Sequence, residues 1–220
     1  MKREYIYPAF ERFWHWAQAI LIILLGVTGF EIHGSFSFFG FGQAVAIHNT
    51  AAISFLVLIA FAIFWHLTSG AWKQYYAPSL KNMRAQVDYY ITGIFRDAPH
   101  PTKKTILSKL NPLQKIVYAG LKVLVIPVMV ISGLIYMYYR YPQQHEIISL
   151  DIDGLSVVAV IHTFGAFMLV AFFVAHVYLT TTGSTPTANL KAMVTGYEDL
   201  HDEAEQKQSE EHDPKLEKVS

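Results

Sequence analysis

The chain has 220 residues, of which 53% are hydrophobic and only 15% charged, and its formal net charge is zero. This composition is typical of membrane proteins, and the balanced charge gives no general reason to expect nucleic acid as a partner. Because the sequence contains no cysteine, it excludes disulfides, thiolate zinc sites, Cys-ligated iron–sulfur clusters and covalently attached haem.

Four apolar runs are long enough to cross a hydrocarbon layer of ~30 Å as helices. They cover residues 13–30, 44–67, 117–138 and 155–181. The only charged residue well inside a run is Lys122, which lies near one end and can extend to the interface. Since the first run is long and lacks a small-residue cleavage site, we expect it to remain as a membrane anchor.

The loop between the second and third runs contains a further helical pattern. Apolar residues recur every three to four positions from Leu80 to Ile94. This periodicity predicts a short amphipathic helix, either on the cytoplasmic membrane surface or packed on a soluble partner. We expect three prolines to interrupt the chain before the third run: Pro99, Pro101 and Pro112.

The C-terminal end differs in composition from the rest of the chain. Residues 198–220 are rich in acidic residues and lysine and contain no aromatic residue. Such a segment cannot bury enough apolar surface to fold, so we expect a disordered charged tail. Residues 1–197 would then form a single four-helix domain.

Lysine and arginine are distributed unevenly between the loops. The first loop has none and the third has only Arg140, whereas Lys2, Arg3 and Arg12 lie near the N-terminus. The second loop carries eight: Lys73, Lys81, Arg84, Arg96, Lys103, Lys104, Lys109 and Lys115. The positive-inside rule therefore predicts that both termini are cytoplasmic, in an all-α membrane protein built as a four-transmembrane-helix bundle.

Two histidines, His162 and His176, lie 14 residues apart in the last run. On one helix they would leave the same face, about 40° apart and ~21 Å apart along the axis. They would therefore lie near the two edges of the membrane, where an imidazole is costly unless it is paired or ligated. One helix with two possible ligands at this separation indicates two haems, one above the other.

Facing histidines are available for both positions. His15 opens the first run near the cytoplasmic face, and His48 lies near the periplasmic end of the second. The predicted pairs are His48 with His162 and His15 with His176, each holding the iron of a non-covalent b-type haem. The alternative is four isolated polar residues bonded to neighbouring helices. Gly26, Gly29 and Gly165 would make room for the haems or simply let helices approach.

His66 competes with His15 for the cytoplasmic position. It is 18 residues from His48, hence ~27 Å deeper, against ~21 Å for the last-run pair. We therefore predict a residue of a quinone site or of the interface, with a solvated histidine as the alternative. The other five histidines are expected to be solvated: His33, His100, His145, His201 and His212.

These motifs together resemble a known family. Arg12-Phe-Trp-His15-Trp, the histidine that begins the second run and His162-x13-His176 are similar to the cytochrome b subunit of bacterial nickel–iron hydrogenases. Formate dehydrogenase gamma and thiosulfate reductase cytochrome b subunits share the pattern. The stretch from Lys109 to Lys115 resembles a motif of those two branches, and the likeness extends over about residues 8–190.

The resemblance implies a membrane-anchoring dihaem subunit that passes electrons between menaquinone or ubiquinone and a periplasmic catalytic, iron–sulfur or multihaem partner. In the formate dehydrogenase branch a quinone binds near the cytoplasmic-side haem, which implies Asn111 and, less directly, Gln114 as quinone residues. Arg12 and Lys122 are candidate counter-charges for haem propionates, and equally ordinary residues of a positive cytoplasmic face.

Two alternatives remain from the sequence. One is a stand-alone quinone-linked electron carrier of the cytochrome b561 type, which needs no catalytic partner. The other is a haem-free membrane anchor or a transporter that uses histidines to carry protons. Enzymatic activity would belong to the complex, with this chain as its electron-transfer subunit.

Overall fold

The computed structural model describes residues 2–75, 79–96, 98, 101, 110–139, 152–183 and 185–200. Four helical segments in this part of the chain are long and apolar enough to cross a membrane: Ala9–Ile32, Phe41–Ser69, Pro112–Tyr138 and Gly154–Thr180. They coincide with the four predicted runs. The predicted all-α, four-span architecture is therefore confirmed.

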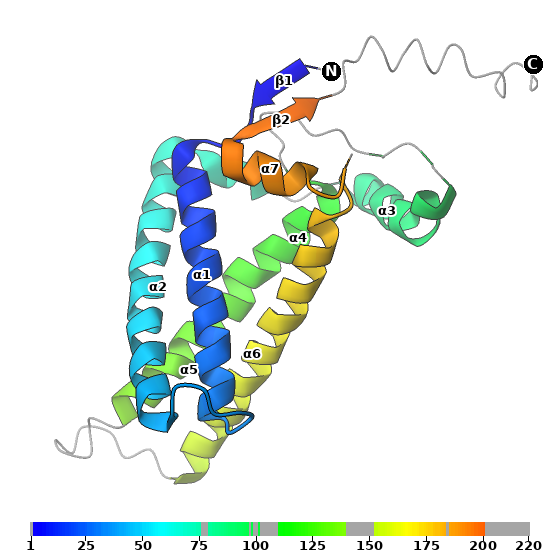
Figure 1. Cartoon of the computed structure of the whole chain (residues 1–220). Coiled ribbons are helices and arrows are strands. Elements are labelled where there is room, and N and C mark those ends of the chain that lie inside the picture. The colour runs from blue at the N-terminus through cyan, green and yellow to red at the C-terminus, as the bar shows by residue number, and fades with distance from the viewer. Residues whose placement is uncertain are drawn as a thin grey trace, which may run out of the picture.

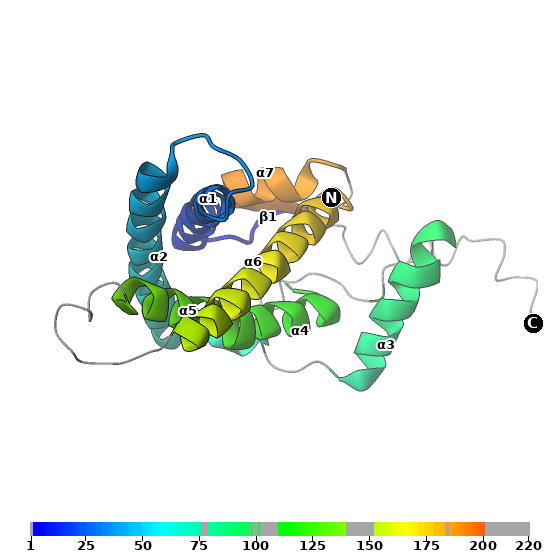
Figure 2. The same ribbon diagram turned by 90° about the horizontal axis from the view of Figure 1, so that it is seen from below.

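The spans form two antiparallel pairs (Figures 1 and 2). Helix α1 (Ala9–Ile32) packs on α2 (Phe41–Ser69), and α5 (Ile126–Tyr139) packs on α6 (Ile152–Thr180). We call the end of the bundle where α1 begins and α6 ends the terminal end. The opposite end, which carries the connection between α1 and α2, is the loop end.

The third span is interrupted by a wider turn. Helix α4 (Pro112–Gly120) passes through a π-type turn at Leu121–Val125 before α5 begins. Pro127 explains the interruption, because proline has no N–H for the helical bond and its ring collides with the carbonyl four residues earlier. Pro112 does not interrupt the chain as predicted. It occupies the first helical position of α4, where a missing N–H costs nothing.

A buried carboxylate closes the connection between α1 and α2. Glu31 is only 4% exposed, and its Oε1 accepts three backbone N–H groups, from Phe38, Phe39 and Gly40, at 2.7–2.8 Å. Gly40 precedes α2 with φ at +85°, a conformation that favours glycine. The loop end is thus tied to the last turn of α1 by charge-assisted hydrogen bonds.

The first and last described segments of the chain meet in a two-stranded ribbon at the terminal end (Figure 1). Strand β1 (Lys2–Tyr5) pairs antiparallel with β2 (Tyr197–Leu200), next to the short helix α7 (Ala188–Thr195). The predicted tail therefore starts too early at residue 198, because residues 198–200 belong to a strand whose partner lies at the other end of the sequence. Residues 201–220 lie outside the described chain.

The N-terminal helix holds α7 in place through two side chains. Arg12 donates from Nη1 to the carbonyl of Val194 at 2.6 Å, and Trp16 donates from Nε1 to that of Met193 at 3.1 Å. The last carbonyls of a helix have no partner within the helix, so both bonds satisfy groups that α7 leaves open. The positive charge of Arg12 also suits the C-terminal end of the α7 dipole.

The predicted amphipathic helix is present but shorter. Helix α3 (Leu80–Asp88) keeps α-helical geometry, after which the chain widens into a π-type turn at Tyr89–Gly93 and then tightens into a 3-10 turn at Ile94–Arg96. Leu80 at its start and Ile91 in the following turn are 81% and 65% exposed, so the described residues leave much of the predicted apolar face open. Several predicted features lie outside the described residues: Pro99, Arg140, Lys103, Lys104, Lys109, His100, His145, His201 and His212.

Candidate haem sites

The fold brings the four predicted histidines together in two facing pairs. At the terminal end, the ring centroids of His15 on α1 and His176 on α6 are 6.1 Å apart. At the loop end, those of His48 on α2 and His162 on α6 are 6.4 Å apart. Each pair joins two different helices across the bundle at one depth.

The distances fit two imidazoles on opposite sides of one iron. Metal–nitrogen bonds to imidazole are ~2 Å, which places the centroids of two trans ligands ~6 Å apart. Among the described residues no group of three or more His, Asp or Glu side chains converges, as a bare metal ion would require. Two ligands per site suit a haem, whose own ring supplies the remaining nitrogens. The residues present therefore fit b-type haem.

Hydroxyl groups select the tautomer of both loop-end histidines. Thr28 Oγ1 lies 3.0 Å from Nδ1 of His48 and donates its own proton to the carbonyl of Leu24 at 2.7 Å. A hydroxyl has one proton, so this oxygen must accept from Nδ1–H. Nε2 of His48 then carries a lone pair, which is the form that binds a metal.

His162 has the same environment on the other helix pair. Ser132 Oγ lies 2.8 Å from its Nδ1 and donates to the carbonyl of Val128 at 2.6 Å. Thr28 and Ser132 are 0% and 4% exposed, so water does not compete for these bonds. Both loop-end histidines are therefore oriented by a buried hydroxyl on the preceding helix of their own hairpin.

A glycine follows each of these hydroxyl residues. A Cβ on Gly29 would lie 3.4 Å from Cε1 of His48, and one on Gly133 would lie 3.2 Å from Cε1 of His162. The glycines thus let each imidazole approach the neighbouring helix backbone. Of the other glycines considered above, Gly165 packs against Met129, whereas Gly26 faces open space.

The terminal-end pair is less symmetric. Tyr118 on α4 places its Oη 3.0 Å from Nδ1 of His176, and Phe172 stacks on the same imidazole with 13° between the ring planes. Nδ1 of His15 is buried and has no hydrogen-bond partner among the described residues. Only one of the two terminal-end histidines therefore has its tautomer influenced by a protein hydroxyl.

His66 lies beside the terminal-end pair without facing His176. Its Nδ1 donates to the carbonyl of Ala62 at 2.7 Å, and its ring packs edge-on against Trp14 with centroids 5.5 Å apart. Lys122 contacts the same tryptophan: its Nζ lies over the Trp14 ring, 5.1 Å from the ring centroid. These contacts account for the positions of both residues, and their quinone and propionate roles stay predictions.

Asn111 and Gln114 form a capping box at the start of α4. Asn111 Oδ1 accepts from the backbone N–H of Gln114 at 2.8 Å, and Gln114 Oε1 accepts from that of Asn111 at 3.0 Å. The Asn111 amide also donates to Tyr90 at 3.1 Å, and burial raises the pKa of Tyr90 despite this bond. The motif therefore has a structural role, beside which its quinone role stays a prediction.

A buried tyrosine lies between the ribbon and the terminal-end pair. Burial raises the pKa of Tyr7, and the nearby Glu198, Glu11 and Tyr118 raise it further, in that order. The same segment is fixed by the backbone, since the N–H groups of Ile6 and Tyr7 both donate to the carbonyl of Gly196. Tyr7 is thus near both Glu198 on the ribbon and Tyr118, the residue that contacts His176.

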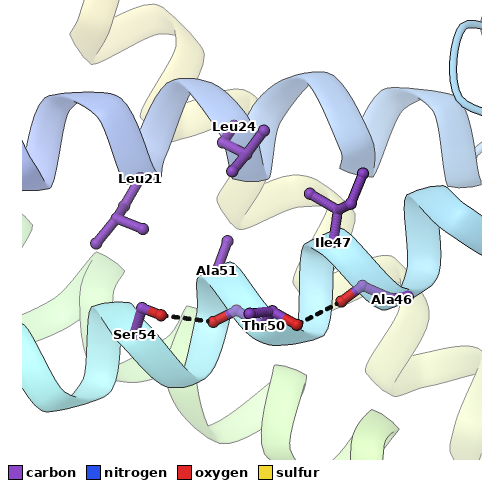
Figure 3. A pocket seen from close by; sticks show the side chains of 7 residues that line it. All are labelled: Leu21, Leu24, Ala46, Ile47, Thr50, Ala51 and Ser54. Carbon is purple, nitrogen blue, oxygen red and sulfur yellow. Dashed lines mark hydrogen bonds between the residues drawn. The ribbon is translucent and has the colours of Figure 1, made fainter.

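One shallow pocket of about 330 Å³ lies between α1 and α2, away from the histidines (Figure 3). Figure 3 shows Leu21, Leu24 and Ile47 pointing into it, while Thr50 and Ser54 bond to carbonyls of their own helix. Both hydroxyl protons are used within the helix, so the only polar groups these two side chains offer to a ligand are oxygens that can accept. The pocket suits a lipid chain better than a cofactor.

Sequence reasoning missed the hydroxyl partners of the histidines. Thr28-Gly29 and Ser132-Gly133 are visible as a hydroxyl residue followed by glycine inside an apolar run. That signal could have been noticed, but its link to a particular histidine depends on helix packing. His33, by contrast, is exposed at the end of α1 as expected.

Comparison with known proteins agrees with the architecture. Residues 6–196 match the family described as prokaryotic cytochrome b561. A relative in Escherichia coli (strain K12), YdhU, which bears the name of a cytochrome, is 31% identical over 205 residues, covering 89% of this chain and 75% of its own length. The matched region contains all four spans and both histidine pairs. The chain is a multi-pass membrane protein of the prokaryotic cytochrome b561 family, a family of b-type haem electron carriers.

Proposed function

We propose that the chain binds two b-type haems and carries electrons across the membrane between a quinone site and a periplasmic oxidoreductase. The observation that carries this proposal is that four histidines face one another in two pairs, His15 with His176 and His48 with His162. Their ring centroids are 6.1 Å and 6.4 Å apart. Haem, when bound, supplies a one-electron centre at each couple. The chain itself would supply two imidazoles to each haem, and a hydroxyl group contacts Nδ1 of three of these four histidines.

The orientation follows from the lysine and arginine distribution. With the positively charged segments inside, the terminal end faces the cytoplasm and the loop end faces the periplasm. The two couples are then separated by ~21 Å along α6, which covers most of the hydrocarbon layer. The quinone site belongs at the terminal end, near Asn111 and His176, and the partner subunit at the loop end.

Haem stoichiometry tests the proposal first. The purified protein is expected to contain two haems per chain by the pyridine haemochrome assay. His176→Ala should lower the content to one and abolish quinone reactivity, because the loop-end couple keeps both of its ligands. Wild-type protein without haem after haem-supplemented expression would refute the proposal, and two haems in His176→Ala would refute the ligand assignment.

A stand-alone carrier between quinone and a diffusible acceptor is the second candidate. The family match over residues 6–196 is compatible with it, since that family is described as prokaryotic cytochrome b561. Both candidates use the same haem ligands and differ at the loop end. Affinity purification from the native membrane distinguishes them: a stoichiometric redox subunit supports the anchor, and a homogeneous single chain with full quinol oxidation supports the carrier.

A further inference from the structure

Hydroxyl groups contact three of the four paired histidines: His48, His162 and His176. These hydroxyl groups differ in the acceptor to which they donate their own proton. Thr28 and Ser132 each donate to a carbonyl of their own helix, at 2.7 Å and 2.6 Å. Tyr118 Oη contacts His176 Nδ1 at 3.0 Å, and within the described residues it has no other hydrogen-bond partner. The phenolic proton is therefore the one that the fold leaves for a further acceptor.

Haem ligation at the terminal end would fix the direction of this bond. When Nε2 of His176 binds iron, Nδ1 carries a proton and must donate, so Tyr118 Oη must accept. The phenol then has its single O–H directed elsewhere. Its neighbours on α4, Ile116 and Val117, are 40% and 46% exposed, so a lipid-soluble molecule can approach this turn.

The position of Tyr118 suits a quinone site between the terminal-end histidine pair and the cytoplasmic surface. It lies seven residues, or ~10 Å along the helix axis, beyond Asn111 and close to the same face. It is also close enough to Tyr7, beneath the terminal ribbon, to raise the pKa of that residue. Asn111, by comparison, uses its amide oxygen on the N–H of Gln114 and one of its two amide protons on Tyr90.

We infer that Tyr118 is a quinone-binding residue, whose O–H donates to a quinone carbonyl while its oxygen accepts from His176. This inference rests on the proposed function and names the contact that the site would make. A quinone carbonyl accepts hydrogen bonds and offers none, so a phenol whose oxygen already accepts is well matched to it. The bond would place the quinone one side chain away from the axial histidine.

The test is the affinity of the haem-loaded protein for decylubiquinone and for menadione. Tyr118→Phe keeps the ring against Phe172 and should raise the dissociation constant about tenfold, the value of one lost hydrogen bond in a site screened from water. Tyr178→Phe is the matched control, since this tyrosine is also near the terminal end of α6 but is 66% exposed. It should leave the affinity unchanged.

The outcomes separate the inference from the function on which it rests. Wild-type protein that binds neither quinone would overturn both. If the wild-type protein binds quinone and Tyr118→Phe binds it with the same affinity, only the inference would be overturned. The same holds if Tyr118→Phe shifts the potential of one haem and leaves quinone affinity unchanged, because the phenol would then serve only to position His176.

A second measurement does not depend on the variant holding its haem. In wild-type protein with ring-labelled tyrosine, infrared difference spectra should show one phenol C–O band that shifts when quinone binds. The band should persist in Tyr178→Phe. No shifted tyrosine band in quinone-saturated protein would overturn the inference.

Discussion

Replacement of Thr28 by valine tests how a buried hydroxyl supports haem binding at the loop end. Valine matches threonine in shape, and Thr28 is 0% exposed, so the change removes the hydroxyl without opening a path for water. His48 Nδ1–H would lose its acceptor at 3.0 Å. Thr28→Ser is the matched control, because serine keeps the oxygen.

The expected loss of haem affinity depends on whether the missing hydrogen bond destabilises the haem-free or the haem-bound protein. Without haem, the His48 ring can turn and find another partner, whereas with haem bound the ring is fixed and Nδ1–H stays unpaired. A buried donor left without a partner costs ~1–3 kcal/mol. A central value of ~2 kcal/mol corresponds to about thirtyfold weaker haem binding at this couple, within the range known for lost partners of metal-ligating histidines.

Haem transfer to an apo-globin acceptor, followed in the visible spectrum, measures this loss. We expect two phases in Thr28→Val, one at the wild-type rate and one about thirtyfold faster. Redox titration should show a change in only one of the two midpoint potentials. Equal haem retention and equal potentials in Thr28→Val and wild type would refute the argument that the hydroxyl fixes the tautomer.

Two further substitutions test the loop end. Gly133→Val should displace the His162 ring, since even a Cβ would lie 3.2 Å from its Cε1, and one haem per chain should be lost. Gly26 faces open space, so Gly26→Val is the control and should retain both haems. Glu31→Ala leaves three backbone donors of residues 38–40 without their carboxylate, and we expect the unfolding free energy in detergent to fall by ~3 kcal/mol, with partial recovery in Glu31→Gln. An unchanged melting temperature in Glu31→Ala would contradict that role.

The spans and the histidine separations could be predicted because each depends on distance along a single helix. Apolar run length sets whether a helix can cross the membrane, and the spacing of His162 and His176 sets the depth of two sites on one face. Facing partners then follow from the direction of each span. For the same reason His66 could be separated from His15 by depth alone.

Features that depend on how helices rotate against one another were not predictable in this way. Which hydroxyl meets which Nδ1 is decided by packing angles, so Thr28 and Ser132 gave only a weak local signal. The ribbon joins residues 2–5 to residues 197–200, and a pair of four-residue strands is stable only where other contacts bring its ends together. Pro127 did carry a readable signal, because proline inside an apolar run predicts a break or bulge.

The two ends of the bundle differ in what they can offer a substrate. At the loop end, both histidines donate to hydroxyls that in turn donate to carbonyls of their own helices, so every proton in the chain of bonds has an acceptor within the protein. Such a closed arrangement suits a site that passes electrons to a protein partner without exchanging protons. At the terminal end, Tyr118 keeps an unassigned proton among the described residues, near Tyr7, whose other neighbours include Glu198 on the ribbon. Quinone chemistry needs protons as well as electrons, so under the proposed function the terminal end, with the phenol of Tyr118, is the end of the described chain that suits it. The same argument predicts that loss of the Ser132 hydroxyl alters one haem potential, whereas loss of the Tyr118 hydroxyl alters quinone affinity.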